Sequence, residues 1–202
     1  VERMLQGIMV AMKESDITVI DELCDIDDLV DAHYEQIKLY VTKISKHEMS
    51  SDESLRCAEI LLFVTNLEHI GDIAENILNI ARKKATDNLS FSKEGLSEIE
   101  ILHQDVTSNL SLATSMFISG DLSIARQLVE EKTEINKLQN QFTQNHLERL
   151  RKGKPDTIAT SSLHLDILRD LRRVHSHITA VAYPVLEKAG SLRKSRLRKP
   201  SH

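Results

Sequence analysis

Residues 60–81 of this 202-residue chain have the sequence ILLFVTNLEHIGDIAENILNIA. Apolar or small side chains recur in it every three or four positions, at Ile60, Val64, Leu67, Gly71, Ala74, Leu78 and Ala81. This spacing matches the 3.6-residue period of a helix that buries one face. Upstream, Ser50 and Glu53 have the spacing of a capping box, which marks a helix start. The pattern therefore predicts a long amphipathic helix that ends near Lys84.

The same period continues on both sides of this helix. It predicts further helices over about 4–14, 17–45, 96–118 and 122–150, and a last one from about 157 to 189. The chain has six Gly, three Pro, no Trp and 3% aromatic residues, so it is poor in the aromatic residues that are enriched in strands. We therefore expect an all-α fold of six helices. Pro184 should kink the last helix, because it lacks an N–H and crowds the carbonyl of Ala180.

The second half of the chain repeats the first. Asp16-Ile-Thr-Val19 matches Asp121-Leu-Ser-Ile124 at an offset of 105, and Asn66-Leu-Glu-His-Ile70 matches Asp170-Leu-Arg-Arg-Val174 at an offset of 104. A near-constant offset in separate segments indicates duplication of a three-helix unit of roughly 100 residues. The predicted organisation is two tandem three-helix bundles with a linker and a tail, over residues 1–86, 87–92 (linker), 93–190 and 191–202 (tail).

The apolar runs, the first residue and the cysteines indicate where in the cell the chain can reside. The longest apolar runs, Ile8–Met12 and Ile60–Val64, are far shorter than the about 20 residues that span a bilayer. The chain begins at Val1 without a signal segment, so we expect a piece of a longer protein. Two cysteines, Cys24 and Cys57, make no disulfide framework and suit a reducing compartment.

Charge is unevenly divided between the halves. Residues 1–104 contain 21 Asp/Glu and 10 Lys/Arg, a net charge of −11, whereas residues 105–202 contain 10 and 16, a net of +6. The first half could hold cations and the second anions. The alternative is two differently solvated surfaces. With a pI near 6 and no reading motif, the chain is not expected to bind nucleic acid.

Two acidic rows are the strongest chemical signal. Asp21, Asp25 and Asp28 have the spacing i, i+4, i+7, which places them on one helix face, and Glu68, Asp72 and Glu75 repeat it. If the rows face each other, their oxygens could surround a divalent or iron-type metal ion, such as Mg, Ca, Mn or iron. Two solvated acidic faces are the alternative reading.

Other catalytic arrangements are missing from the sequence. His175 and His177 point about 200° apart on a helix and cannot share an ion, while His164 and His175 suit a packed core. A ferritin-like di-iron site needs Glu-x-x-His on two helices, and the chain offers only Glu100 and His103. No glycine-rich phosphate loop or nucleophilic triad is present. We therefore expect no enzyme.

Two basic segments lie in the second half. Five positive charges in residues 193–199 could meet anionic lipid or an acidic partner, or form a solvated end. Arg169, Arg172 and Arg173 lie on the last long helix, where Arg172 and Ser176 replace Glu68 and Asp72 at the aligned positions. This replacement favours an anion or an acidic partner surface, with internal pairing of Arg172 to Asp170 or Glu130 as the alternative.

The duplicated unit with Asn66-Leu-Glu-His-Ile-Gly-Asp-Ile-Ala-Glu-Asn-Ile77 resembles the PhoU family, whose repeats carry a Glu-Arg-Ile-Gly-Asp type signature. Residues 162–186 look like the cytoplasmic C-terminal PhoU-like domain of bacterial Na/Pi cotransporter family proteins. The resemblance implies an all-helical phosphate-regulatory module, frequent dimers and, in some members, metal held by Glu/Asp-x-x-x-Asp motifs. Carried over, it implies metal at Glu68 and Asp72, with candidate partners Asp25 and Asp28, and weaker candidates Glu75, Glu130, Glu134 and Asp170.

The sequence thus predicts a non-enzymatic regulatory domain of a sodium-dependent phosphate transporter, on the cytoplasmic side of the bacterial inner membrane. Its partners would be the transmembrane transporter part of the same chain and a second copy in a homodimer. A stand-alone PhoU-type regulator that docks on a phosphate transporter or sensor kinase is the alternative. A metal-dependent enzyme is a remote third.

Overall fold

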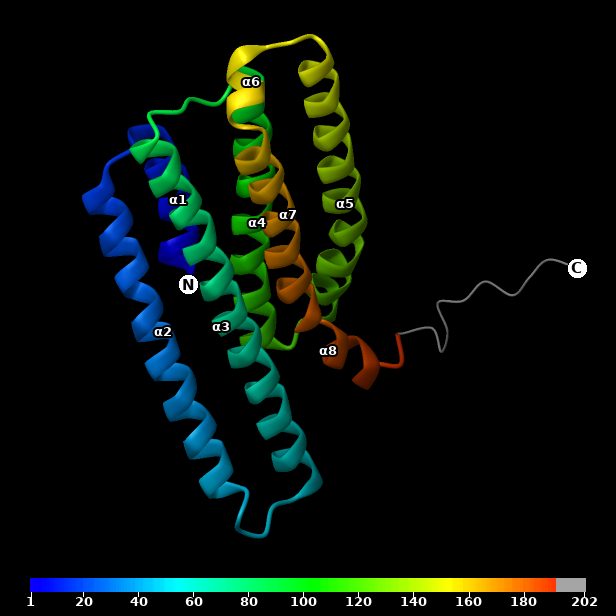
Figure 1. Ribbon diagram of the computed structural model, residues 1–202. Coiled ribbons are helices and arrows are strands. Elements are labelled where there is room, and N and C mark those ends of the chain that lie inside the picture. The colour runs from blue at the N-terminus through cyan, green and yellow to red at the C-terminus, as the bar shows by residue number, and fades with distance from the viewer. Residues whose placement is uncertain (192–202) are drawn as a thin grey trace, which may run out of the picture.

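The computed structural model describes residues 1–191, and all its regular structure is helical (Figure 1). The helices are α1 (Glu2–Glu14), α2 (Ile17–Ile44), α3 (Ser51–Thr86), α4 (Lys93–Ser119), α5 (Leu122–Arg151), α6 (Pro155–Ala159), α7 (Ser161–Ala180) and α8 (Tyr183–Lys188). Six of them are long, and no strand occurs within residues 1–191. The predicted all-α fold is confirmed.

Side chains cap the starts of α2, α3 and α5, and one of these caps is the capping box predicted at Ser50. The Asp16 carboxylate accepts the Thr18 N–H at 2.8 Å and the Asp121 carboxylate accepts the Ser123 N–H at 2.7 Å. At α3 the Ser50 hydroxyl accepts the Glu53 N–H while the Glu53 carboxylate accepts the Ser50 N–H, which completes the capping box. These contacts satisfy N–H groups that have no partner inside the helix.

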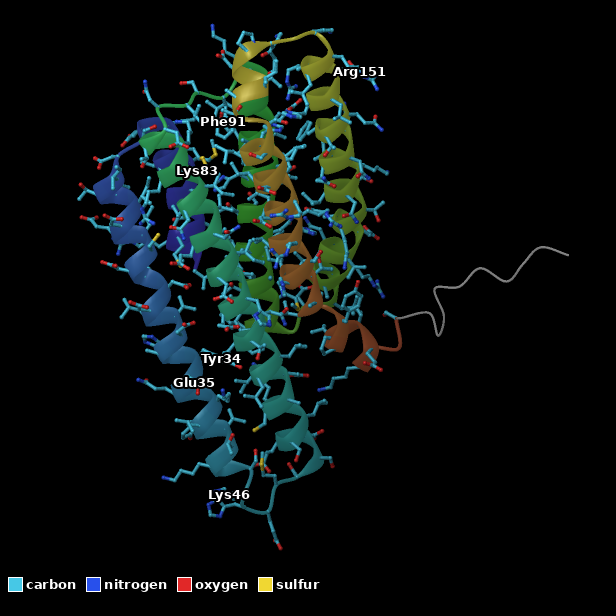
Figure 2. All side chains as sticks on the ribbon, viewed as in Figure 1. Tyr34, Glu35, Lys46, Lys83, Phe91 and Arg151 are labelled. Atoms are coloured by element: carbon cyan, nitrogen blue, oxygen red, sulfur yellow. The ribbon has the colours of Figure 1, made fainter. Side chains whose placement is uncertain are left out.

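The two repeats are built alike and share one core. Helices α1, α2 and α3 pack together as the first bundle, and α4, α5 and α7 as the second. Helix α3 also packs against α7, and α1 against α4, so buried apolar residues of both bundles form one continuous cluster. In Figure 1 the hairpin of α2 and α3 extends beyond the turn that joins α4 to α5. Figure 2 shows Tyr34, Glu35 and Lys46 along this extension, and Phe91 at the opposite end, in the connection between the repeats.

The last predicted helix is interrupted. Its main part, α7, ends at Ala180, and α8 begins at Tyr183, directly before Pro184. The predicted effect of Pro184 is confirmed, since the ladder breaks there, while α3 continues unbroken past the aligned Ile80. The break at Thr160 that separates α6 from α7 was not expected, because Pro155 begins α6 and no proline or glycine follows it before α7.

None of the helices in residues 1–191 combines the length and the apolar character that crossing a membrane requires. The basic run 193–199 lies outside the described residues.

Candidate metal centre

The candidate site is built around an acid in the apolar stripe of α2. A stripe of buried or half-buried residues recurs along α2 at intervals of three and four positions, and most of them are apolar: Ile20, Leu23, Asp27, Val30, Tyr34, Ile37 and Val41. Asp27 occupies a position of this stripe. Opposite it lies Gly71 of α3, where an added Cβ would come within 2.5 Å of the Asp27 Oδ1. The glycine therefore lets the Asp27 carboxylate reach the backbone of α3.

Asp72 is shared by two groups of ligand-type side chains. One comprises Asp27, Asp31 and Asp72, and the other Glu68, His69 and Asp72; within each group the ligand atoms lie within 4.8 Å of one another. We call Asp27, Asp31, Glu68 and Asp72 the acidic cluster. Helix α2 supplies two of its carboxylates and α3 the other two, so the cluster joins the two helices.

No Lys or Arg forms an ion pair with the acidic cluster among the described residues, although His69 lies 2.9 Å from Glu68 and the amino group of Val1 is close to Asp27. The Asp27 Oδ1 is buried and has no hydrogen-bond partner among the described residues. Burial, together with the charges of Asp31, Glu75 and Asp72, raises the pKa of Asp27 to about 6. Burial likewise raises the pKa of Glu68, although His69 opposes the shift. A bound cation would satisfy the unpartnered oxygen and neutralise the repulsion, so these residues fit a metal ion.

The predicted residues are only partly brought together. Glu68 and Asp72 lie in the acidic cluster, and Glu75 is close enough to raise the pKa of Asp27. Asp25 and Asp28 lie exposed on another face of α2 and belong to neither group of ligand-type side chains.

Sequence reasoning missed Asp27, Asp31 and His69. A signal for the first was present, because Asp27 is an acid inside an otherwise largely apolar stripe with the spacing of a helix face. An acid at such a position is a stronger indicator than an acid in a run of exposed acids.

The second repeat reaches this site from α7. The rings of His69 and His177 lie 5.1 Å apart, and a hydrogen bond of 3.0 Å joins the His177 Nδ1 to the Asn66 Oδ1. Together with Asp72, Ile73 and Arg173 the two histidines line a hollow of about 250 Å³. Burial, then the neighbouring His69 and Arg173, lowers the pKa of His177. His177 is therefore neutral at pH 7 and faces the site.

The other histidines behave as predicted. His175 points into the second bundle, where Asn109 lies 3.1 Å from its Nε2, and both His164 and His175 are 1% exposed. The prediction of packed core roles for these two histidines is confirmed.

The weaker candidates of the second repeat have other surroundings. Asp170 is fully buried and accepts hydrogen bonds from Asn76, Arg169 and Arg173, so it ties α3 to α7. The other two, Glu130 and Glu134, are exposed, and Glu134 pairs with Lys137. Among residues 1–191, both ligand groups lie in the first repeat.

Two of the three arginines of α7 form ion pairs within residues 1–191, and the third does not. Arg169 pairs with Asp166 and Asp170, and Arg173 with Asp170. The alternative that Arg172 pairs internally is not observed: it forms no ion pair with a described residue, and its buried Nε has no hydrogen-bond partner.

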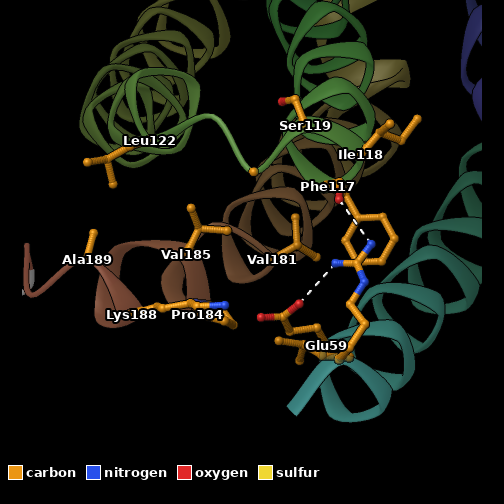
Figure 3. Close-up of a pocket in the computed structure, with 13 residues that line it drawn as sticks. Glu59, Phe117, Ile118, Ser119, Leu122, Val181, Pro184, Val185, Lys188 and Ala189 are labelled. Atoms are coloured by element: carbon orange, nitrogen blue, oxygen red, sulfur yellow. Dashed lines mark hydrogen bonds and ion pairs between the residues drawn. The ribbon is translucent and has the colours of Figure 1, made fainter. Parts of the chain in front are cut away.

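A larger hollow, of about 450 Å³, lies away from the acidic cluster (Figure 3). It opens between α3, the α4–α5 turn and α8, and its walls are mainly apolar. Its guanidinium, that of Arg56, is already occupied by Glu59 at 3.0 Å and by the Phe117 ring at 4.5 Å. Because unopposed charges converge at the acidic cluster and not here, the acidic cluster is the better candidate site.

Comparison with known proteins agrees with this architecture. Residues 1–81 and 99–185 match the family described as PhoU domain. Proteins of Salmonella typhimurium and Escherichia coli K12 described as "Putative inorganic phosphate export protein YjbB" are 38% and 37% identical over 187 residues, 92% of this chain. The chain spans about a third (34%) of their length.

Two solved structures share the fold. PhoU from Pseudomonas aeruginosa superposes with a TM-score of 0.86 at 19% identity, covering 95% of this chain and 90% of that one. The phosphate transport system regulatory protein PhoU from Streptococcus pneumoniae gives 0.81 at 15% identity, covering 96% and 90%. With the family match over both repeats, these comparisons show that the chain belongs to the PhoU family.

Proposed function

We propose that this chain is a PhoU-type, non-enzymatic regulator of phosphate transport that docks on a phosphate transporter or on a sensor controlling one. The observation that carries the proposal is the match of this chain to the PhoU family over both repeats. The description of its relatives, which names phosphate export, agrees with it. The fold supports it, since one solved structure that shares the fold is described as a phosphate transport system regulatory protein. A regulator of this kind would work on the cytoplasmic side of the bacterial inner membrane, where the transporter presents its soluble face.

A second version of this function places the regulator and the transporter in one polypeptide. It is favoured by one observation: relatives at 37–38% identity are about three times as long as the part this chain matches. No observation supports sodium as the coupled ion. The complete gene distinguishes the two versions, because a transporter part would add apolar segments of about 20 residues.

The regulator proposal is tested by phosphate flux in cells. A strain lacking the complete gene is compared with the same strain carrying wild type, Asp72→Asn or Asp52→Asn, and radioactive phosphate uptake and efflux are measured. We expect wild type and Asp52→Asn, an exposed change outside the acidic cluster, to restore the normal flux. Unchanged flux in the deletion strain at both low and high phosphate would refute a role in phosphate transport.

We propose further that the acidic cluster holds a divalent or iron-type cation, with His69 as an additional ligand. The unpartnered Oδ1 of Asp27 supports this proposal, because a buried carboxylate oxygen without a donor is costly. A purely carboxylate set suits Mg or Ca, whereas adding an imidazole shifts preference towards Mn, Fe or Zn. In the flux experiment Asp72→Asn should then behave as the deletion.

Two other expectations stay predictions. A homodimer would appear in sedimentation equilibrium as twice the mass of the chain. A metal-dependent enzyme would show turnover that disappears when the metal is removed, and the site offers no nucleophile beside the carboxylates for that role.

A further inference from the structure

The second repeat contains a counterpart of the acidic cluster in which every member has changed. At the offset of 105, Lys132 and Asn136 of α5 replace Asp27 and Asp31; at the offset of 104, Arg172 and Ser176 of α7 replace Glu68 and Asp72. The register is secure because the buried residues of α2 have buried equivalents in α5: Ile20 and Ala125, Leu23 and Leu128, Val41 and His146. Four acids have become two cations, an amide and a hydroxyl.

The structure keeps the facing arrangement of these positions. Asp27 lies against Gly71 in the first repeat, and the residue equivalent to Gly71 is His175. Lys132 is near enough to His175 to lower its pKa, and the Lys132 Nζ lies 5.8 Å from the Tyr183 ring. Lys132 therefore lies on the side of α5 that meets α7 and α8, as Asp27 lies on the side of α2 that meets α3.

Neither cation of this counterpart forms an ion pair within residues 1–191, although the Lys132 ammonium lies over the Tyr183 ring. The ion pairs of α5 and α7 use Lys137, Arg149, Arg169 and Arg173, and none involves Lys132 or Arg172 among residues 1–191. Glu131, next to Lys132 in the sequence, also acts on His175 and opposes the lowering of its pKa; its carboxylate accepts a hydrogen bond from Gln127 at 2.9 Å and is close to Asp105 of α4.

Arg172 adds a donor without an acceptor. Its Nε is buried and has no hydrogen-bond partner, although the neighbouring Arg169 and Arg173 both bond to Asp170. A buried guanidinium N–H without an acceptor is unfavourable unless a ligand completes it. The planar fork of arginine matches the oxygens of a phosphate group, and lysine adds a point charge.

We propose that Lys132, Asn136 and Arg172 form a binding site for a phosphate group, at the position where the first repeat carries the acidic cluster. The site would give the proposed regulator its response to phosphate, but phosphate binding does not depend on the regulator proposal or on a metal in the first repeat. Lysine and arginine supply charge, and the amide of Asn136 and the hydroxyl of Ser176 are additional polar groups at the rim. Arg169 and Arg173, which the sequence grouped with Arg172, are engaged with Asp166 and Asp170.

The test is isothermal titration of the purified chain with inorganic phosphate in chelator-containing buffer at constant ionic strength. We expect one saturable site per chain. Lys132→Gln and Arg172→Gln should each weaken the affinity about tenfold to a hundredfold, the range for a lost hydrogen bond to a charged group. Lys137→Gln is the matched control, because it removes the same charge from the same helix at an exposed position paired with Glu134.

Vesicles distinguish the two sources of a phosphate group. The chain is sedimented with phosphatidylglycerol vesicles and with neutral phosphatidylcholine vesicles. Saturable binding of free phosphate identifies the ion as the ligand; binding only to phosphatidylglycerol, lost in Lys132→Gln and Arg172→Gln, identifies a lipid headgroup. The proposal is overturned if neither binds, or if Lys137→Gln weakens binding as much as Lys132→Gln. Circular dichroism of each variant shows that it is folded, and Lys132→Gln keeps the test valid should Arg172→Gln unfold.

Discussion

The two repeats share a register but treat a buried carboxylate in opposite ways. In the second repeat Glu98 of α4 receives a two-pronged ion pair from Arg149, at 2.8 and 2.6 Å, and a third hydrogen bond from Asn145 at 3.0 Å. In the first repeat the Asp27 Oδ1 has no partner among the described residues. The comparison indicates that the chain supplies close ion-pair partners for the buried carboxylate of the second repeat, whereas it supplies no hydrogen-bond donor for the Asp27 Oδ1 among the described residues.

The pKa values follow from this difference. Burial alone would raise the pKa of Glu98, but hydrogen bonds from His164, Arg149 and Asn145 outweigh it and lower the pKa to about 2. Asp27 has burial and like charges without such donors, and its pKa rises to about 6. One carboxylate stabilises the fold as an anion, and the other destabilises it until a proton or a cation arrives.

The largest expected effect comes from breaking the ion pair of the second repeat. Arg149→Ala leaves Glu98 as a buried charge without its main partner, which should cost about 3–5 kcal/mol of the free energy of unfolding. Arg151→Ala, one helical half-turn away and exposed, should change it by less than about 0.5 kcal/mol. Urea unfolding of the three proteins measures both values. Equal, small effects would mean that the ion pair adds nothing to stability.

The second-largest effect is expected from acid, which should lower the stability of the second repeat. Burial lowers the pKa of His146 and of His175 to about 4, so each is neutral in the fold but protonated below about pH 6.5 in the unfolded chain. Their contribution is present above pH 6.5 and is lost as the pH falls towards 4, by about 2 kcal/mol each at pH 5. Unfolding at pH 7.5 and pH 5 checks this.

The matched variants for the acid prediction are His146→Gln and His47→Gln. The first should remove its share of the pH dependence, and the second, at an exposed position, should leave the dependence unchanged. A His146→Gln protein with the full wild-type dependence would contradict the assignment.

In the first repeat, a cation should replace the missing partner of Asp27. At a hundredfold excess of metal over Kd the gain in stability is about 2.7 kcal/mol, and Asp27→Asn or Asp72→Asn should abolish it. Asp28→Asn should retain it, because Asp28 is exposed and outside the acidic cluster. Melting temperatures of these variants with Mn, Zn, Fe, Mg or Ca, and with chelator, show which face of α2 binds the metal. Loss of the gain in Asp28→Asn would favour the face predicted from sequence.

The smallest effect is expected at Gly71. An alanine there improves helix propensity by about 1 kcal/mol, but its Cβ would meet the Asp27 Oδ1 at 2.5 Å and displace that carboxylate. We expect a net stability change below about 1 kcal/mol together with weaker metal binding. Melting and metal titration of Gly71→Ala measure the two quantities separately. Unaltered metal affinity would show that Asp27 is not a ligand.

The fold could be predicted because its signals are local. The capping box at Ser50, the helical period and the Pro184 break each depend on a few neighbouring residues. The site was predicted only in part, because α2 carries acids on several faces and its sequence does not show which face packs against the neighbouring helix. Asp27 and Asp28 are 100° apart on α2, and packing against Gly71 selects the first. The approach of His177 to His69 joins different repeats and has no sequence signal of its own.

Metal stoichiometry tests the divergence of the two repeats most directly. The purified chain is loaded with Mn or Zn, freed of excess metal, and weighed by native mass spectrometry beside Asp72→Asn. We predict one metal ion per wild-type chain, held by the acidic cluster, and none in Asp72→Asn. Two ions per chain, or none in the wild type, would contradict the proposal that the first repeat holds the one cation site of residues 1–191.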